Sequence, residues 1–160
     1  MYNKQSQIKN EKYHKGFYEN KEENIITHLL KIEDNNPNEE FKKTGCCYNA
    51  ESFLHGICHI FAYALHQEFG YDILELKSNN CSAVHWCCTT QYKGVELYVD
   101  IRGMTSDIDE LLTVFQPNMK TKPIIDKITD LTNYKDEWEE DAVKFANEII
   151  KKYYNYYSIN

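Results

Sequence analysis

The chain has 160 residues and a formal net charge of −7 at pH 7, with 42% hydrophobic and 27% charged residues. This length and composition are typical of a single globular domain with a core of its own. No basic block is present and no apolar run approaches the ~20 residues that cross a bilayer, so we expect neither nucleic acid nor a membrane as partner.

We expect a cytoplasmic protein, or one delivered without a cleaved signal peptide. The first eight residues are mostly polar and lack the apolar stretch of a signal peptide. In a reducing cytoplasm most cysteines are free thiols that pack as small hydrophobic residues. We expect this of at least four of the six, which are Cys46, Cys47, Cys58, Cys81, Cys87 and Cys88.

The first fifty residues predict one helix between two irregular segments. Residues 1–21 are polar and predict a loosely attached N-terminal arm. Apolar residues repeat at helical spacing over residues 22–32, and the turn cluster 34–38 ends this helix. Residues 39–50 predict a loop.

The clearest pattern is a helix that ends at Gly70. Its apolar stripe comprises Ile57, Phe61, Ala64, Leu65 and Phe69. Gly70 follows the stripe where a helix C-terminus favours a left-handed residue. Gly56 interrupts the run before the stripe, so the chain either kinks there or the helix begins beside Cys58.

Three short strands follow, over residues 72–77, 83–90 and 95–102, and a turn at Lys93-Gly94 joins the last two as a hairpin. The remainder predicts a short helix with a capping box of Asp107 and Glu110, a loop at Pro117 and Pro123, and a final helix over about 135–157. Residues 22–160 therefore predict one α+β domain.

Cys58 is the first candidate for chemistry. A helix N-terminus stabilises a thiolate through its free N–H groups and its dipole. Gly56, two residues earlier, would let a substrate backbone pass close to the sulfur. On this segment alone, a core position on the apolar stripe is the simpler interpretation of Cys58.

His85 and Asp100 are predicted on adjacent antiparallel strands, roughly opposite each other. A carboxylate there could hold the Nδ1–H of the imidazole and leave Nε2 free to accept a proton. Asp100 lies in an apolar strand, where an unpaired ion is costly, so it needs His85 or Arg102 as a partner. Arg102 could instead recognise a substrate carboxylate or face solvent.

A Cys at a helix start, a His on a strand and an Asp on the next strand, in this order, resemble the papain-like thiol enzyme superfamily, especially its transglutaminase-like and bacterial peptidase branches. The resemblance covers residues 56–103 and includes the aromatic Trp86 directly after His85. It implies a papain-like minimal core, in which a nucleophile-bearing helix packs on a small antiparallel sheet with flanking helices. It also implies Cys58 as nucleophile, His85 as general base and Asp100 as orienting acid, with no cofactor.

Members of this superfamily use the nucleophile's own N–H and a polar side chain upstream to bind the oxyanion. Asn49 or Ser52 could supply that side chain, and Trp86 and Arg102 complete the expected oxyanion or substrate-binding set. The predicted function is that of a thiol-dependent amide hydrolase or acyltransferase, a cysteine peptidase, deamidase or transglutaminase-like enzyme acting on a peptide or protein. The residues do not choose between hydrolysis and transfer.

Two alternatives stay open at this point. The first is a non-catalytic binding, inhibitor or effector protein on the same scaffold, such as one from a phage or another mobile element. The second is a zinc-binding domain, because His55, Cys58 and His59 have helical spacing and His85 or Cys87 could complete a tetrahedral set. The chain has no Cys-x-x-Cys knuckle, and this favours the thiol enzyme over the zinc site.

Overall fold

A computed structural model describes residues 12–16, 18, 52–78, 83–115, 123–131 and 140–159. These residues form a six-stranded antiparallel sheet in the order β1-β5-β4-β3-β2-β6 and five α-helices, so the chain is a mixed α and β protein, as predicted. The predicted helix 22–32, the loop 39–50 with Asn49, and Cys46, Cys47 and Cys81 lie outside the described residues.

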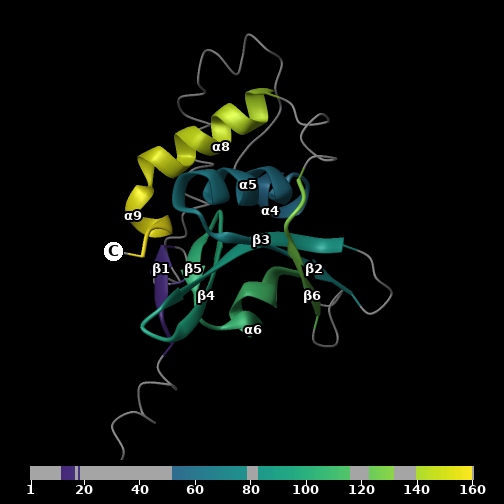
Figure 1. The fold of residues 1–160 in the computed structure, drawn as a ribbon, viewed down its shortest axis with the longest axis vertical. Coiled ribbons are helices and arrows are strands. Elements are labelled where there is room, and N and C mark those ends of the chain that lie inside the picture. The colour runs from purple at the N-terminus through teal and green to yellow at the C-terminus, as the bar shows by residue number, and fades with distance from the viewer. Residues whose placement is uncertain are drawn as a thin grey trace, which may run out of the picture.

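The helices and strands follow one another in a simple order. They are β1 (His14–Gly16), α4 (Ser52–His55), α5 (Cys58–Phe69), β2 (Asp72–Lys77), β3 (Ala83–Tyr92), β4 (Val95–Asp100), β5 (Gly103–Thr105), α6 (Ile108–Leu112), a 3-10 turn η1 (Thr113–Phe115), β6 (Ile124–Ile128), α8 (Glu140–Lys152) and α9 (Tyr154–Tyr157). Helix α5 packs on one face of the sheet, α8 lies across the outer side of α5, and α6 covers the opposite face (Figure 1).

Helix α5 begins at Cys58 because the chain turns at the two residues before it. The backbone N–H groups of Gly56 and Ile57 both donate to the carbonyl oxygen of Ser52, at 3.0 and 2.8 Å, and close the short helix α4. At the other end, Gly70 has a φ of 72° and caps the helix with an N–H bond to His66. The predicted helix end at Gly70 is confirmed, and of the two possibilities left open at Gly56 the structure shows a helix that begins at Cys58.

The predicted hairpin is confirmed, with Lys93 and Gly94 both at positive φ as a tight β-turn requires. The second strand extends to Tyr92, beyond the predicted end at residue 90. The predicted third strand is wrong at its end, because β4 stops at Asp100. There the Asp100 carboxylate accepts the N–H of Arg102 at 2.9 Å, which is an Asx turn, and Gly103 at a φ of 115° starts β5.

Two segments depart from the predicted fold, namely β6, where no strand was expected, and the N-terminal arm. Its residues His14–Gly16 form β1 at the edge of the sheet, paired with β5, and Tyr18 is buried. The strand is only three residues long, too short for a sequence pattern. In the final helix, residues 135–139 lie outside the described ones, and the helix breaks at Tyr153, where φ is −112°. Across the described segments, no helix is long and apolar enough to cross a membrane.

Candidate active site

His85 and Asp100 form a buried pair across β3 and β4. Nε2 of His85 lies 3.0 Å from Oδ2 of Asp100, and the two residues are 1% and 2% exposed. The last registered pair of β3 and β4 is Cys88–Val99, so the next step would place Asp100 opposite Cys87, two residues beyond His85. His85 therefore reaches Asp100 diagonally, through Nε2, the ring nitrogen that lies farther from the backbone. The predicted bond through Nδ1 is wrong.

Arg102 holds the other side of the Asp100 carboxylate. Its Nη2 donates to Oδ2 at 2.6 Å and its Nε lies 3.2 and 3.1 Å from the two oxygens. Nη2 also donates to the carbonyl oxygen of Leu111 at 2.7 Å, which ties the turn to α6. Arg102 is 1% exposed, so it lies in the interior and does not face solvent. Of the roles considered for Arg102, the structure matches that of an ion-pair partner of Asp100.

The charges of this cluster fix the protonation of Asp100. Burial would raise the pKa of its carboxyl, but the Arg102 guanidinium and the His85 imidazole together hold that pKa well below its ordinary value. Burial likewise opposes the charge of Arg102, while the Asp100 carboxylate raises the Arg102 pKa above its ordinary value. Asp100 is therefore a permanent anion at neutral pH.

Cys58 is half-buried at the first position of α5 and bonds to the edge of β3. The backbone N–H of Trp86 donates to its Sγ at 3.3 Å. Because the β3–β4 ladder ends at Cys88, no other described strand pairs with this stretch of β3 on that side. The sulfur occupies that place, which explains how a helix on one face of the sheet brings its thiol to a histidine that packs on the other.

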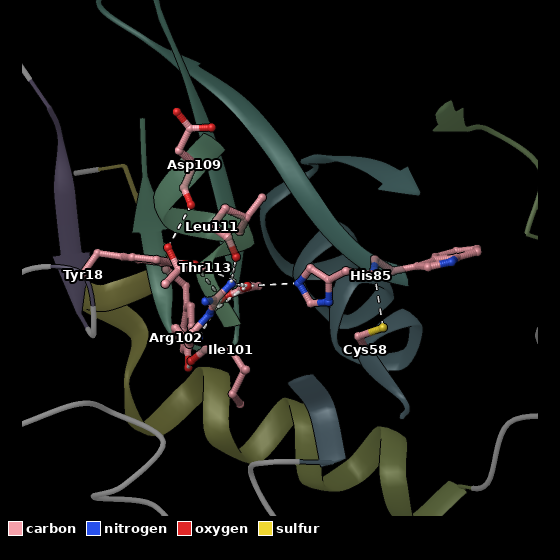
Figure 2. A network of polar contacts seen from close by, with 11 residues as sticks. Tyr18, Cys58, His85, Ile101, Arg102, Asp109, Leu111 and Thr113 are labelled. Atoms are coloured by element: carbon pink, nitrogen blue, oxygen red, sulfur yellow. Dashed lines mark hydrogen bonds and ion pairs between the residues drawn. The ribbon is translucent and has the colours of Figure 1, made fainter. Parts of the chain in front are cut away.

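The second nitrogen of the His85 ring faces Cys58. Figure 2 shows Tyr18, Arg102, His85 and Cys58 in succession, with Nδ1 of His85 on the side of the ring nearest Cys58. Among the described residues Nδ1 is buried and has no hydrogen-bond partner within normal geometry. Burial lowers the pKa of His85, but the hydrogen-bonded Asp100 carboxylate and the nearby Cys58 sulfur outweigh this effect, so the pKa is raised above its ordinary value.

The remaining predicted site residues are placed as follows. Trp86 is 7% exposed and reaches Cys58 through its backbone, while its ring lies edge-on to His59 at 6.0 Å. Ser52 starts α4 and acts on the turn before Cys58 through its carbonyl group. Asn49 lies outside the described residues.

Two aromatic residues of this cluster were missed by the sequence analysis. The centroid of the Phe115 ring lies 4.6 Å from the centroid of the His85 ring and 5.9 Å from Cζ of Arg102. Tyr18 lies on the opposite side of the cluster, with its hydroxyl 3.4 Å from both Asp100 oxygens. Neither residue stands in a recognisable sequence motif. The only signal for them is indirect, because a buried Asp–Arg pair must be surrounded by other side chains.

The other thiols of the described chain behave as the sequence predicts. Cys87 and Cys88 are free and fully buried, and burial raises the pKa of both well above the ordinary value. Cys88 donates to the carbonyl oxygen of Ala62 on α5 at 3.1 Å, so it serves packing. Of these three cysteines, Cys58 alone is partly accessible.

The residues of the zinc alternative do not form a metal-binding group. Within the described segments, no three His, Cys, Asp or Glu side chains form a group that could hold a metal ion. His55 packs against Phe115 and His59 against Trp86. The structure thus offers no support for a metal centre among them.

Comparison with known proteins does not assign the chain to a family. No protein-family model, no curated protein and no solved structure matches it. The case for a function therefore rests on the geometry of Cys58, His85 and Asp100.

Proposed function

We propose that the chain is a papain-like thiol enzyme that attacks amide bonds of a peptide or protein through Cys58, His85 and Asp100. The observation that carries this proposal is the orientation of the His85 ring, whose two nitrogens face different partners. Nε2 is held by the Asp100 carboxylate at 3.0 Å, while Nδ1 is buried and lies on the side of the ring that faces the Cys58 thiol. A base held in this way is the arrangement that nucleophilic catalysis by Cys requires.

The first step would form the acyl-enzyme. Nδ1 of His85 takes the thiol proton, and the thiolate is stabilised by the Trp86 N–H and by the N-terminus of α5. The sulfur attacks the amide carbonyl carbon, and the N–H of Cys58, which has no helical acceptor at the first position of α5, donates to the oxyanion. Nδ1–H of His85 then protonates the leaving amine as the C–N bond breaks.

The second step would release the acyl group. Nδ1 of His85 accepts a proton from a water molecule, whose oxygen attacks the thioester and displaces the Cys58 sulfur. The product is a carboxylic acid, as in a peptidase or deamidase. With an amine in place of water, the same step forms a new amide and the enzyme is a transferase.

Alkylation of the thiols tests the proposal. We expect iodoacetamide at about pH 6 to modify Cys58 faster than the other cysteines, because only an ion-paired thiolate is reactive there. His85→Ala should abolish this preference, whereas the control His55→Ala, an exposed histidine of the preceding helix, should keep it. Peptide mapping by mass spectrometry gives the rate for each thiol.

Activity assays then separate the possible reactions. Cleavage of labelled casein, ammonia release from a glutamine-containing peptide, and incorporation of a labelled amine report peptidase, deamidase and transferase activity. Slow and equal labelling of all six thiols, with none of the three activities, would leave a non-catalytic binding protein as the better description.

A further inference from the structure

The N-terminal strand segment, defined as residues 12–16 with Tyr18, is bound to the turn that carries Arg102. In the β1–β5 ladder Gly16 pairs with Gly103. A Cβ atom on Gly103 would collide with the carbonyl oxygen of Lys15, and one on Gly16 would lie 2.9 Å from that of Arg102. The two glycines therefore allow an approach that no other residue type permits.

Polar contacts fix the rest of this segment. The N–H of Tyr13 donates to the Ser106 hydroxyl at 2.8 Å, and the N–H of Ser106 donates to the carbonyl oxygen of Tyr13 at 2.9 Å. Further contacts reach α6 and the C-terminal residues, namely Lys12–Asp107 at 2.6 Å, His14–Glu110 at 2.9 Å and Lys15 to the carbonyl oxygen of Ser158 at 2.7 Å. The N-terminal strand segment is thus bound to β5 with Ser106, to α6 and to the C-terminal residues.

Tyr18 brings this segment to the carboxylate of the candidate triad. Its hydroxyl is shared between the two Asp100 oxygens at 3.4 Å, and its ring lies 5.0 Å from the guanidinium carbon of Arg102. Burial and the charge of Asp100 raise the pKa of Tyr18 well above its ordinary value, so the phenol keeps its proton and donates it. The tyrosine is 6% exposed.

We propose that Tyr18 is a positioning residue, through which docking of the N-terminal strand segment sets the orientation and charge of the Asp100–His85 pair. This inference rests on the proposed function, because it concerns regulation of the same site. Figure 2 shows the path, from Tyr18 beside β1, through the cluster around Arg102, to His85 and Cys58. An event that displaces the segment would then change the reactivity of Cys58 without touching it.

The direction of the effect follows from the charges around the pair. Asp100 and Cys58 face His85, whereas Asp100, Arg102, Cys87 and Glu110 act on Tyr18. Without the Tyr18 hydroxyl, the Asp100 carboxylate accepts one hydrogen bond fewer, so its negative charge is less neutralised. It then attracts a proton on Nε2 of His85 more strongly. The imidazolium is then stabilised, and the pKa of His85 rises.

The test is a titration of the His85 ring by NMR in the full chain. Tyr18→Phe removes the hydroxyl and keeps the ring, and Tyr13→Phe is the matched control, because Tyr13 packs against Tyr92 instead. His85→Gln identifies the resonance. We expect Tyr18→Phe to raise the pKa of His85 by a few tenths of a pH unit and Tyr13→Phe to leave it unchanged.

A second variant tests docking rather than the hydroxyl. Gly16→Ala should loosen β1 with Tyr18 chemically intact, and we expect the same upward change in the His85 titration. Unchanged titration in both Tyr18→Phe and Gly16→Ala would overturn the inference.

The outcome is separable from that of the proposed function. If Cys58 is labelled selectively and His85 is required, but Tyr18→Phe changes neither the titration nor the pH profile of labelling, the positioning role is wrong and the proposed function stands. If the titration responds to Tyr18→Phe while labelling is slow and unselective, the coupling stands and the catalytic proposal is wrong.

Discussion

His85 binds Asp100 through Nε2, at 3.0 Å, and so directs its Nδ1 toward Cys58. Both partners are buried, and Arg102 supplies the compensating positive charge on the far side of the carboxylate. When the His85 imidazole is protonated, the Asp100 carboxylate lies between two positive charges, those of His85 and Arg102. The protonation of His85 is therefore linked to the stability of the fold as well as to the reactivity of the thiol.

The first prediction concerns stability against pH. Because the pKa of His85 is raised in the folded protein, the proton it binds stabilises the fold fully below the unfolded value of about 6.5, and this stabilisation is lost as pH rises through the folded pKa. Urea unfolding should therefore show a larger deficit for His85→Gln at about pH 6 than at about pH 9.

The exposed His55 provides the control for this prediction. His55→Gln, measured over the same pH range, shows what the loss of an exposed imidazole costs, and the deficit of His85→Gln is compared with it. A deficit of His85→Gln that grows toward alkaline pH would mean that the buried imidazole is neutral in the folded state.

The second prediction concerns acid. The pKa of Asp100 is lowered in the folded protein, so its stabilisation is present above the unfolded value of about 3.9 and is lost as pH falls below it. The free energy of unfolding should decline steeply below about pH 4, and Asp100→Asn should flatten this decline. An equally steep decline in Asp100→Asn would assign the acid sensitivity to other carboxyl groups.

The third prediction concerns the buried charge of Arg102. Arg102→Met leaves Asp100 without its main counter-charge and should lower the free energy of unfolding by about 3–5 kcal/mol. The matched control is Lys127→Met, which breaks an ion pair with Asp72 whose side chains are 56% and 52% exposed, and should cost less than about 1 kcal/mol. Urea denaturation of both variants checks this, and equal costs would contradict the buried-pair interpretation.

Local patterns predicted the centre of this protein well. The Gly70 cap and the Lys93-Gly94 turn are each set by residues within a few positions, and both are confirmed. Of the two possibilities left open at Gly56, the structure shows the helix start beside Cys58. That Asp100 is paired could also be expected, because an anion in an apolar strand needs compensation. The sequence offered His85 or Arg102 as the partner, and the structure shows that both pair with it.

What the sequence could not predict depends on contacts far apart in the chain. Strand β1 has three residues and exists because Gly16 meets Gly103, nearly ninety residues away. Which imidazole nitrogen meets Asp100 depends on the register where β3 and β4 separate, and alternation of side chains does not reveal it. Tyr18 joins the site for the same reason, through a strand that only tertiary structure defines.

The fourth prediction separates backbone strain from close packing. Gly70 and Gly103 both have positive φ, but a Cβ atom at Gly70 would meet nothing within 4 Å, whereas one at Gly103 would collide with Lys15. Gly70→Ala should cost about 1–2 kcal/mol, and Gly103→Ala should cost more and also release β1. Urea unfolding, with hydrogen exchange at the amides of residues 14–16, measures both effects, and equal costs with protected amides would contradict it.

The last prediction concerns access to Cys58. Gly56 is exposed, its φ is not in the left-handed region, and an added Cβ would meet only the carbonyl oxygen of Ser52 at an ordinary 3.6 Å. Gly56→Leu should therefore fold, yet fill the approach along which a peptide backbone would reach the sulfur. We expect turnover of a peptide substrate to fall at least about tenfold, a barrier increase of about 1.4 kcal/mol, while alkylation by the small iodoacetamide changes little. Equal loss of both would mean that the substitution disturbs Cys58 itself, and loss of neither would mean that the substrate does not pass over Gly56.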